Sequence, residues 1–174
     1  VSGLIQESGL LEEKLAGIGI SNQRETVLVW DRETGEPVYN AIVWQCARAE
    51  SICKKIEKAG YAELIRERTG LTLSPYFSAS KIAWIMQNVP GCLEKADAKK
   101  LCIGTMDSWL IYKLTEGTSF YTDYSNASRT QLFNIHTLQW DAEICSVFGI
   151  DVDSLPQVVD SNKKKKKTSL AGHL

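Results

Sequence analysis

Apolar residues change their spacing several times along the N-terminal quarter of the chain. Residues 4–15 carry leucine and isoleucine at helical intervals, which predicts a short amphipathic helix. Residues 15–20 form a compact apolar run, the pattern of a strand buried on both faces. Residues 26–30 and 38–43 are rich in β-branched and aromatic residues, and the turn-forming segment 31–37 separates them. This part of the chain therefore predicts a helix, a buried strand and an antiparallel hairpin, which together indicate a mixed α/β sheet.

Beyond the hairpin the apolar pattern is mainly helical. Gly60, Gly70 and Gly149 each follow a helical segment, and glycine is common just past the C-terminus of a helix. A proline-glycine pair at residues 90–91 closes another helical segment. The predicted elements are helices over residues 47–59, 61–68, 78–88, 105–114 and 141–148 and a short strand over residues 101–103.

Composition places the chain among ordinary globular domains. Its 174 residues are enough for one domain with a core, and 44% of them are hydrophobic and 24% charged. A run of about 18 apolar residues is absent, which predicts no membrane span, and the N-terminus has no signal-peptide pattern. The five cysteines are scattered and form no CxxC pair, which predicts reduced thiols in a cytoplasmic protein.

The net charge of −1 hides an uneven distribution of basic residues. Five of the 20 lysines and arginines form the run at residues 163–167, and no acidic residue follows Asp160. Residues 1–160 are therefore acidic as a whole, which argues against nucleic acid as a partner. We expect residues 1–160 to form the domain and residues 161–174 to be a Lys-rich tail without a fixed structure.

Five polar residues, 21–25, directly follow the predicted buried strand. In open α/β sheets, ligands bind outside the carboxyl ends of strands. Arg24 offers forked donors and Glu25 offers acceptors, so the two together complement a polyol, whose hydroxyls both donate and accept. The alternative is a solvated loop with an incidental charge pair.

Two aromatic residues are further candidates for the same ligand. Trp44 closes the second strand of the predicted hairpin and could form an apolar wall beneath a small ligand. On its sequence position alone, a tryptophan that fills the core is the better interpretation. Tyr76 lies in an extended stretch before a predicted helix, and its hydroxyl could bond either to a ligand or to the backbone.

Other polar residues favour a structural interpretation. Asp107 falls in the first turn of a predicted helix, where a carboxylate is stabilising whatever the function. Asp123 and Asn126, close to Arg129, are expected to cap or turn the chain. His136 has no second metal ligand in register, so we expect a structural histidine. The common phosphate-loop, metalloprotease and hydrolase motifs are absent from the sequence.

Two segments place particular residue types at a fixed spacing. Residues 76–88 hold Lys81 midway between Ser78 and Trp84 and end in a polar pair, and residues 19–26 contain a Gln-Arg-Glu run. These segments resemble the FGGY carbohydrate kinases and, within that family, the glycerol kinases. Xylulose and gluconate kinases of the family typically carry a Gln-Met-His-like run instead. The resemblance covers nearly all of the predicted domain and stops at the lysine run.

The resemblance implies a fold and a binding site. The fold is expected to be α/β, of the ribonuclease-H-like (actin-like ATPase) type, and the chain would be part of the N-terminal domain of a two-domain kinase. Arg24, Glu25 and Tyr76 match the residues that hold the glycerol hydroxyls in this family. Trp44 matches the apolar wall beneath the carbon chain of glycerol.

The resemblance also implies a reaction. An intact enzyme of this kind transfers the γ-phosphoryl group of ATP, with Mg²⁺, to glycerol and forms sn-glycerol 3-phosphate, as a cytoplasmic homo-oligomer. The general base and most of the ATP site are expected outside this chain, so we expect no catalytic residue here and no activity of the fragment alone. The alternatives are another FGGY kinase, acting on a different polyol or sugar, and an inert truncated product.

Overall fold

The computed structural model describes residues 2–9 and 17–162, and its first element is helix α1 (Ser2–Ser8). Helix α1 agrees with the first half of the predicted amphipathic helix, whose second half lies outside the described residues. The strand predicted over residues 15–20 is wrong for its described part: residues 17–20 form no strand, and Ile18 is 46% exposed. The backbone of a strand needs a hydrogen-bonded neighbour, and no described strand pairs with this segment.

The centre of the molecule is a pair of antiparallel strands, β1 (Val27–Asp31) and β2 (Leu101–Thr105). Every residue of both strands is buried. Side chains alternate along β1: Val27 and Val29 join the larger apolar core, whereas Leu28 and Trp30 join a smaller cluster on the opposite face. Burial on both faces explains why both strands read as continuous apolar runs.

The predicted hairpin is confirmed only in part. Residues 37–42 return antiparallel to β1, but they pair with it only at two isolated bridges, Val27 with Ile42 and Trp30 with Pro37. The turn predicted over residues 31–37 is present: Asp31 Oδ1 accepts hydrogen bonds from the amides of Glu33 at 3.0 Å and Thr34 at 3.1 Å. Regular pairing of β1 is therefore with β2, the strand predicted over residues 101–103.

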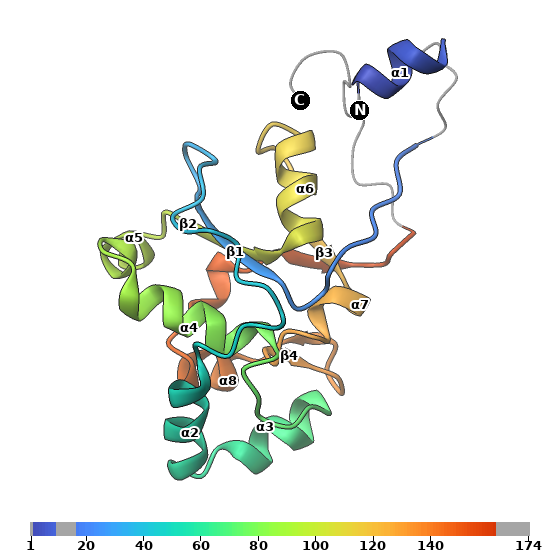
Figure 1. Cartoon of the computed structure of the whole chain (residues 1–174). Helices are drawn as coiled ribbons and strands as arrows, with labels where there is room; N and C mark the ends of the chain where they lie inside the picture. The colour runs from blue at the N-terminus through green and yellow to red at the C-terminus, as the bar shows by residue number, and fades with distance from the viewer. Residues whose placement is uncertain (1, 10–16, 163–174) are drawn as a thin grey trace.

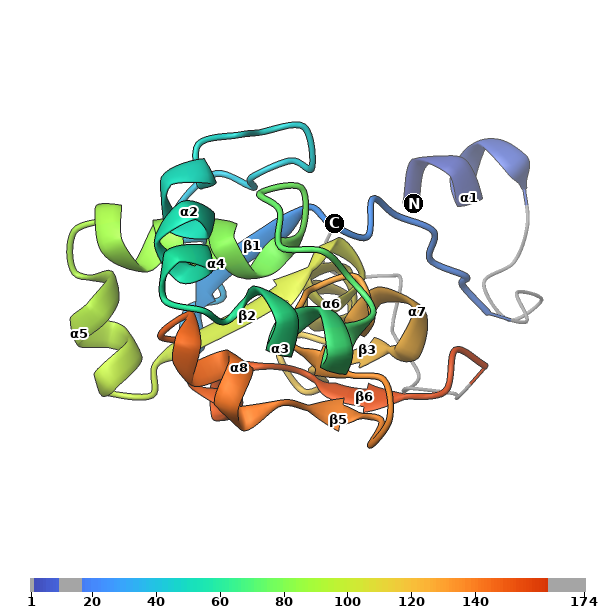
Figure 2. The ribbon, with the colours of Figure 1, turned by 90° about the horizontal axis from the view of Figure 1, so that it is seen from below.

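Helices cover both faces of β1 and β2. Helix α4 (Ser78–Asn88) packs on one face, and α6 (Met106–Leu114) stands on the other (Figure 1). On the α6 side, the rings of Trp109 and Tyr112 lie with their centroids 5.2 and 5.5 Å from that of Trp30. Helix α2 (Glu50–Lys58) lies beside α4, as the view from below shows (Figure 2). The two strands are thus the middle layer of three.

The five predicted helices are confirmed, with ends that differ by up to three residues. Their counterparts are α2, α4 and α6, together with α3 (Ala62–Thr69) and α8 (Ala142–Val147). The described chain also contains short elements that the apolar pattern did not predict: α5 (Cys92–Asp97), α7 (Tyr124–Ala127), a 3-10 turn (Val152–Ser154), and the strands β3 (Tyr121–Asp123), β4 (Phe133–Asn134), β5 (Gln139–Trp140) and β6 (Gln157–Val159).

The short strands form two further pairs. Strand β3 runs parallel to β6, and β4 forms a tight antiparallel pair with β5. Strand β3 leads directly into α7. Asn126 of α7 accepts a hydrogen bond from Asn22, so α7 lies near the segment that precedes β1. None of the described helices is long and apolar enough to cross a membrane. The predicted Lys-rich tail stays a prediction, because residues 163–174 lie outside the described residues.

Candidate functional site

Glu25 is a buried carboxylate at the point where the chain enters β1. The residue is 6% exposed, and its carboxylate Oε1 accepts a hydrogen bond from Arg129 Nε at 2.8 Å. Its backbone carbonyl accepts a second one, from Ser78 Oγ at 3.2 Å. These contacts tie the start of β1 to the first turn of α4 and to the segment after α7.

Aromatic rings lie around the same ion pair. The guanidinium carbon of Arg129 is 4.9 Å from the ring centroid of Phe77 and 5.9 Å from that of Tyr76. The Tyr76 ring in turn lies 5.5 Å from the Trp44 ring, with the two planes inclined at 60°. Trp44 and Tyr76 are both half-buried, so each ring presents one part to the protein and another to solvent.

The structure thus brings together three of the four residues that the sequence singled out. Glu25, Tyr76 and Trp44 are connected through ring contacts and through Arg129. Arg24 precedes Glu25 in the chain and is exposed, and it forms no hydrogen bond or ion pair with the described residues. The Arg24 guanidinium therefore has no partner among the residues that the structure describes.

Lys81 is a further functional candidate, which the sequence analysis noted only for its spacing between Ser78 and Trp84 and to which it gave no role. Its side chain has no exposed surface, and its Nζ donates to the backbone carbonyls of Tyr76 at 2.6 Å and Pro75 at 3.3 Å. Burial lowers the pKa of this amine to about 8. Lys81 therefore fixes the backbone that carries Tyr76. The sequence signal that could have indicated this role is a lysine on an otherwise apolar face of the helix predicted over residues 78–88.

The structural interpretations of the remaining polar residues are confirmed. Asp107 is buried and accepts from Thr105 Oγ1 at 2.5 Å and Thr122 Oγ1 at 2.8 Å, and burial raises its pKa. Asp123 caps α7 by accepting from the amide of Asn126 at 2.8 Å. His136 Nε2 lies 3.0 Å from the carbonyl oxygen of a residue in α3.

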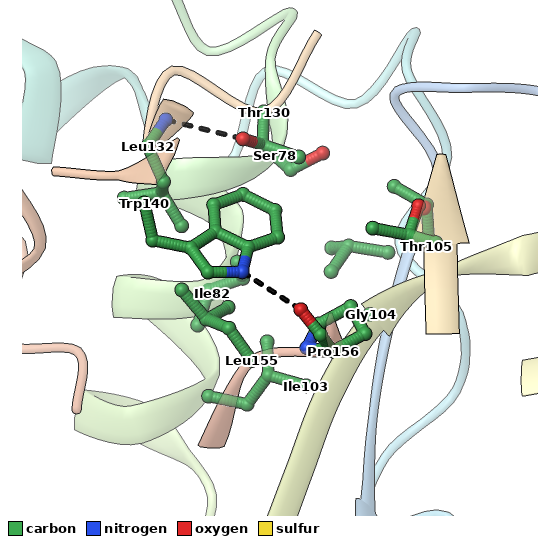
Figure 3. A pocket seen from close by; sticks show the side chains of 12 residues that line it. Ser78, Ile82, Ile103, Gly104, Thr105, Thr130, Leu132, Trp140, Leu155 and Pro156 are labelled. Carbon is green, nitrogen blue, oxygen red and sulfur yellow. Dashed lines mark hydrogen bonds between the residues drawn. The ribbon is translucent and has the colours of Figure 1, made fainter. Parts of the chain in front are cut away.

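A small cavity lies behind this cluster, between α4 and the strands (Figure 3). Its volume is about 10 Å³, room for about one water molecule, so it is too small for a polyol. Trp140 and Leu132 line the cavity, and each is held by a hydrogen bond. The indole Nε1 of Trp140 donates to the carbonyl of Pro156 at 2.8 Å, and the amide of Leu132 donates to Thr130 Oγ1 at 3.1 Å. This cavity is therefore not a binding site for a molecule of that size.

Within residues 2–9 and 17–162, no three or more His, Cys, Asp or Glu side chains are grouped in a way that could hold a metal ion. The chemistry of the residues around Glu25 is instead that of hydroxyl recognition. A carboxylate, a free guanidinium and a phenol can exchange hydrogen bonds with adjacent hydroxyl groups, and an indole can cover the carbon face between them.

Known proteins resemble this chain over most of its length. Residues 1–172 match the model of the FGGY family of carbohydrate kinases, N-terminal domain. Glycerol kinase 2 of Clostridium tetani is 57% identical over 159 residues, which cover 91% of this chain and 32% of the relative. The chain therefore spans about a third of the length of the curated relatives it matches.

Solved structures share the fold. A glycerol kinase of Plasmodium falciparum with ADP superposes with a TM-score of 0.78 at 46% identity, over 81% of this chain and 28% of that one. A gluconate kinase of Lactobacillus acidophilus superposes with a TM-score of 0.81 at 24% identity, over 97% and 32%, which shows the fold alone. The expected ribonuclease-H-like α/β fold, as part of an N-terminal kinase domain, is confirmed. With the family model matching nearly its whole length, the chain belongs to the FGGY family of carbohydrate kinases.

Proposed function

We propose that a complete protein carrying this chain transfers the γ-phosphoryl group of ATP to glycerol and forms sn-glycerol 3-phosphate. The observation that carries this proposal is the cluster of Glu25, Tyr76 and Trp44 beside the exposed Arg24. The identity of 57% to a glycerol kinase supports glycerol as the polyol. The fold alone does not distinguish glycerol from gluconate, because a gluconate kinase shares it.

In this proposal each residue has a role in holding glycerol. Glu25 accepts a hydrogen bond from one hydroxyl, and Arg24 donates to the same or the neighbouring one. The phenol of Tyr76 adds a contact, and Trp44 covers the carbon chain and excludes water from it. Two hydroxyls are then fixed and the third is left free to react.

Phosphoryl transfer depends mainly on such positioning and on neutralising charge. ATP supplies the phosphoryl group, and Mg²⁺ would neutralise part of its charge. We assign neither of them to a described residue, and we propose that the general base also comes from another part of the complete protein. We further propose a cytoplasmic homo-oligomer. The five cysteines are free thiols, four of them buried, which fits a reducing compartment.

The test is a substrate panel on the complete protein, with glycerol, xylulose and gluconate as acceptors and ATP consumption as the readout. We expect kcat/KM for glycerol to exceed that for either of the other acceptors by about 100-fold or more, because buried polar groups matched to one set of hydroxyls reject another. Preference for xylulose or gluconate would replace glycerol in the proposal and leave the family unchanged.

A further inference from the structure

Arg129 is a largely buried cation to which neither the sequence analysis nor the proposed reaction gives a role. Its side chain is 27% exposed, and it pairs with the 7% exposed side chain of Glu25 from a position 104 residues further along the chain. It lies just beyond α7, whose first turn is fixed by the Asp123 cap. Asn22 Nδ2 also donates to Asn126 Oδ1 at 3.1 Å, which holds the segment before Glu25 against α7.

The ion pair between Arg129 and Glu25 uses one of the nitrogen donors of the guanidinium and one of the two carboxylate oxygens. Arg129 donates through Nε to Oε1 of Glu25, and no described residue bonds to Oε2 of Glu25 or to the terminal nitrogens of Arg129. Arginine–carboxylate pairs that serve stability alone gain most from a two-point, fork-to-fork geometry. A one-point contact leaves one carboxylate oxygen available to a ligand.

The rings restrict where the guanidinium can lie. Its carbon is within 6 Å of the ring centroids of both Phe77 and Tyr76, the range in which a cation is attracted to an aromatic ring. A lysine ammonium could supply the charge, but it could not stack on the two rings and donate sideways to Glu25 at once.

We propose that Arg129 is a positioning residue that holds Glu25 Oε1 and braces the Tyr76 ring, so that Glu25 Oε2 and the Tyr76 hydroxyl face the substrate polyol. This inference rests on the proposed function, since it concerns the same site. A carboxylate as buried as Glu25 is costly without a cation. Arg129 supplies that cation and at the same time sets the direction of the free oxygen.

The experiment compares three variants of the complete protein with the wild type. Arg129→Gln removes the cation, and Arg129→Lys keeps the charge without the fork. Arg68→Gln is the matched control: Arg68 is 33% exposed and pairs with the 6% exposed Asp141 at 3.1 Å, outside the site. The measurements are KM for the polyol, KM for ATP, and the midpoint of thermal unfolding.

We expect Arg129→Gln to raise KM for glycerol by about 10- to 100-fold, with KM for ATP changed by less than about twofold. Arg129→Lys should recover part of that loss. Arg68→Gln should lower the unfolding midpoint and leave both KM values unchanged. If Arg129→Gln does not fold, Arg129→Lys decides: we expect its KM for glycerol to rise by about fivefold or more.

The inference is overturned if KM for glycerol stays at the wild-type value in Arg129→Gln, or in Arg129→Lys where only that variant folds. It is also overturned if Arg129→Gln affects both KM values equally. Failure of the proposed function looks different. In that case the wild-type protein prefers another polyol, and the KM for that polyol is the quantity that the Arg129 variants must raise.

Discussion

Lys81 carries an amine at a position without exposed surface, with two backbone carbonyls as its partners. Burial disfavours the charged form, so its pKa falls from 10.5 to about 8. Below pH 8 the folded protein therefore holds a buried charge at a cost. Between pH 8 and 10.5 the unfolded chain binds more protons at this residue than the folded one does, so folding stability due to Lys81 rises with pH.

Replacing Lys81 by methionine removes this dependence. We expect the free energy of unfolding of the wild type, relative to Lys81→Met, to increase by about 2–3 kcal/mol between pH 8 and 10.5. Urea unfolding of both proteins at several pH values in this window measures the difference. A difference that does not change with pH would mean that the amine is not held in the charged, desolvated state described here.

The residue scale also shows where sequence reasoning was incomplete. The sequence pointed to Arg24, Glu25, Trp44 and Tyr76 through family motifs, and the structure brings the last three together. It gave Arg129 no role, because its partner Glu25 lies 104 residues away and no local pattern records such a pair. A pair of side chains so far apart in the sequence can be recognised only from the three-dimensional structure.

At the scale of elements, the apolar pattern predicted the longer helices and missed several of the shortest helices and strands. Helix α4 has the predicted ends, since eleven residues give the apolar period room to repeat. Strands β4 and β5 have two residues each, too few for any period to appear. The run at residues 17–20 has the composition of a strand, but a strand also needs a neighbour, and composition does not reveal one.

Gly104 shows how closely two elements approach. A Cβ placed on this residue of β2 would lie 2.7 Å from the Cβ of Ser108 in α6 and 3.2 Å from the ring of Trp30. We expect Gly104→Ala to lower the free energy of unfolding by about 1–3 kcal/mol, because α6 must shift to make room.

The matched control for this prediction is Gly17→Ala, since a Cβ on Gly17 would meet no described atom within 4 Å. Chemical unfolding of the two variants and the wild type gives the comparison. Equal stability of Gly104→Ala and Gly17→Ala would contradict the close contact between β2 and α6.

At the scale of the whole molecule, the fold brings Tyr76 and the charged residues of the site together from three distant segments, and Trp44, from a fourth, packs against the Tyr76 ring. The segment leading into β1 supplies Arg24 and Glu25, the loop before α4 supplies Tyr76, and the chain after α7 supplies Arg129. Each is anchored by a rigid neighbour: a buried strand, a buried helix or a capped turn. Precise placement of a few polar groups is what the proposed phosphoryl transfer to a small polyol would require.

Arg24→Ala in the complete protein tests the central claim, that this cluster binds glycerol, most directly. Arg24 forms no hydrogen bond or ion pair with the described residues, so its removal should change the free energy of unfolding by less than about 0.5 kcal/mol. The exposed Arg66, whose side chain pairs with the exposed Glu63 and with no other described residue, provides the control variant Arg66→Ala.

The measurement is kcat/KM for glycerol. We expect Arg24→Ala to lose about 2–4 kcal/mol of transition-state stabilisation, with a raised KM, and Arg66→Ala to match the wild type. Arg24→Lys should recover little of the loss, because an ammonium cannot reproduce the two-point geometry of a guanidinium. Glycerol kinetics in Arg24→Ala equal to those of the wild type would contradict the claim.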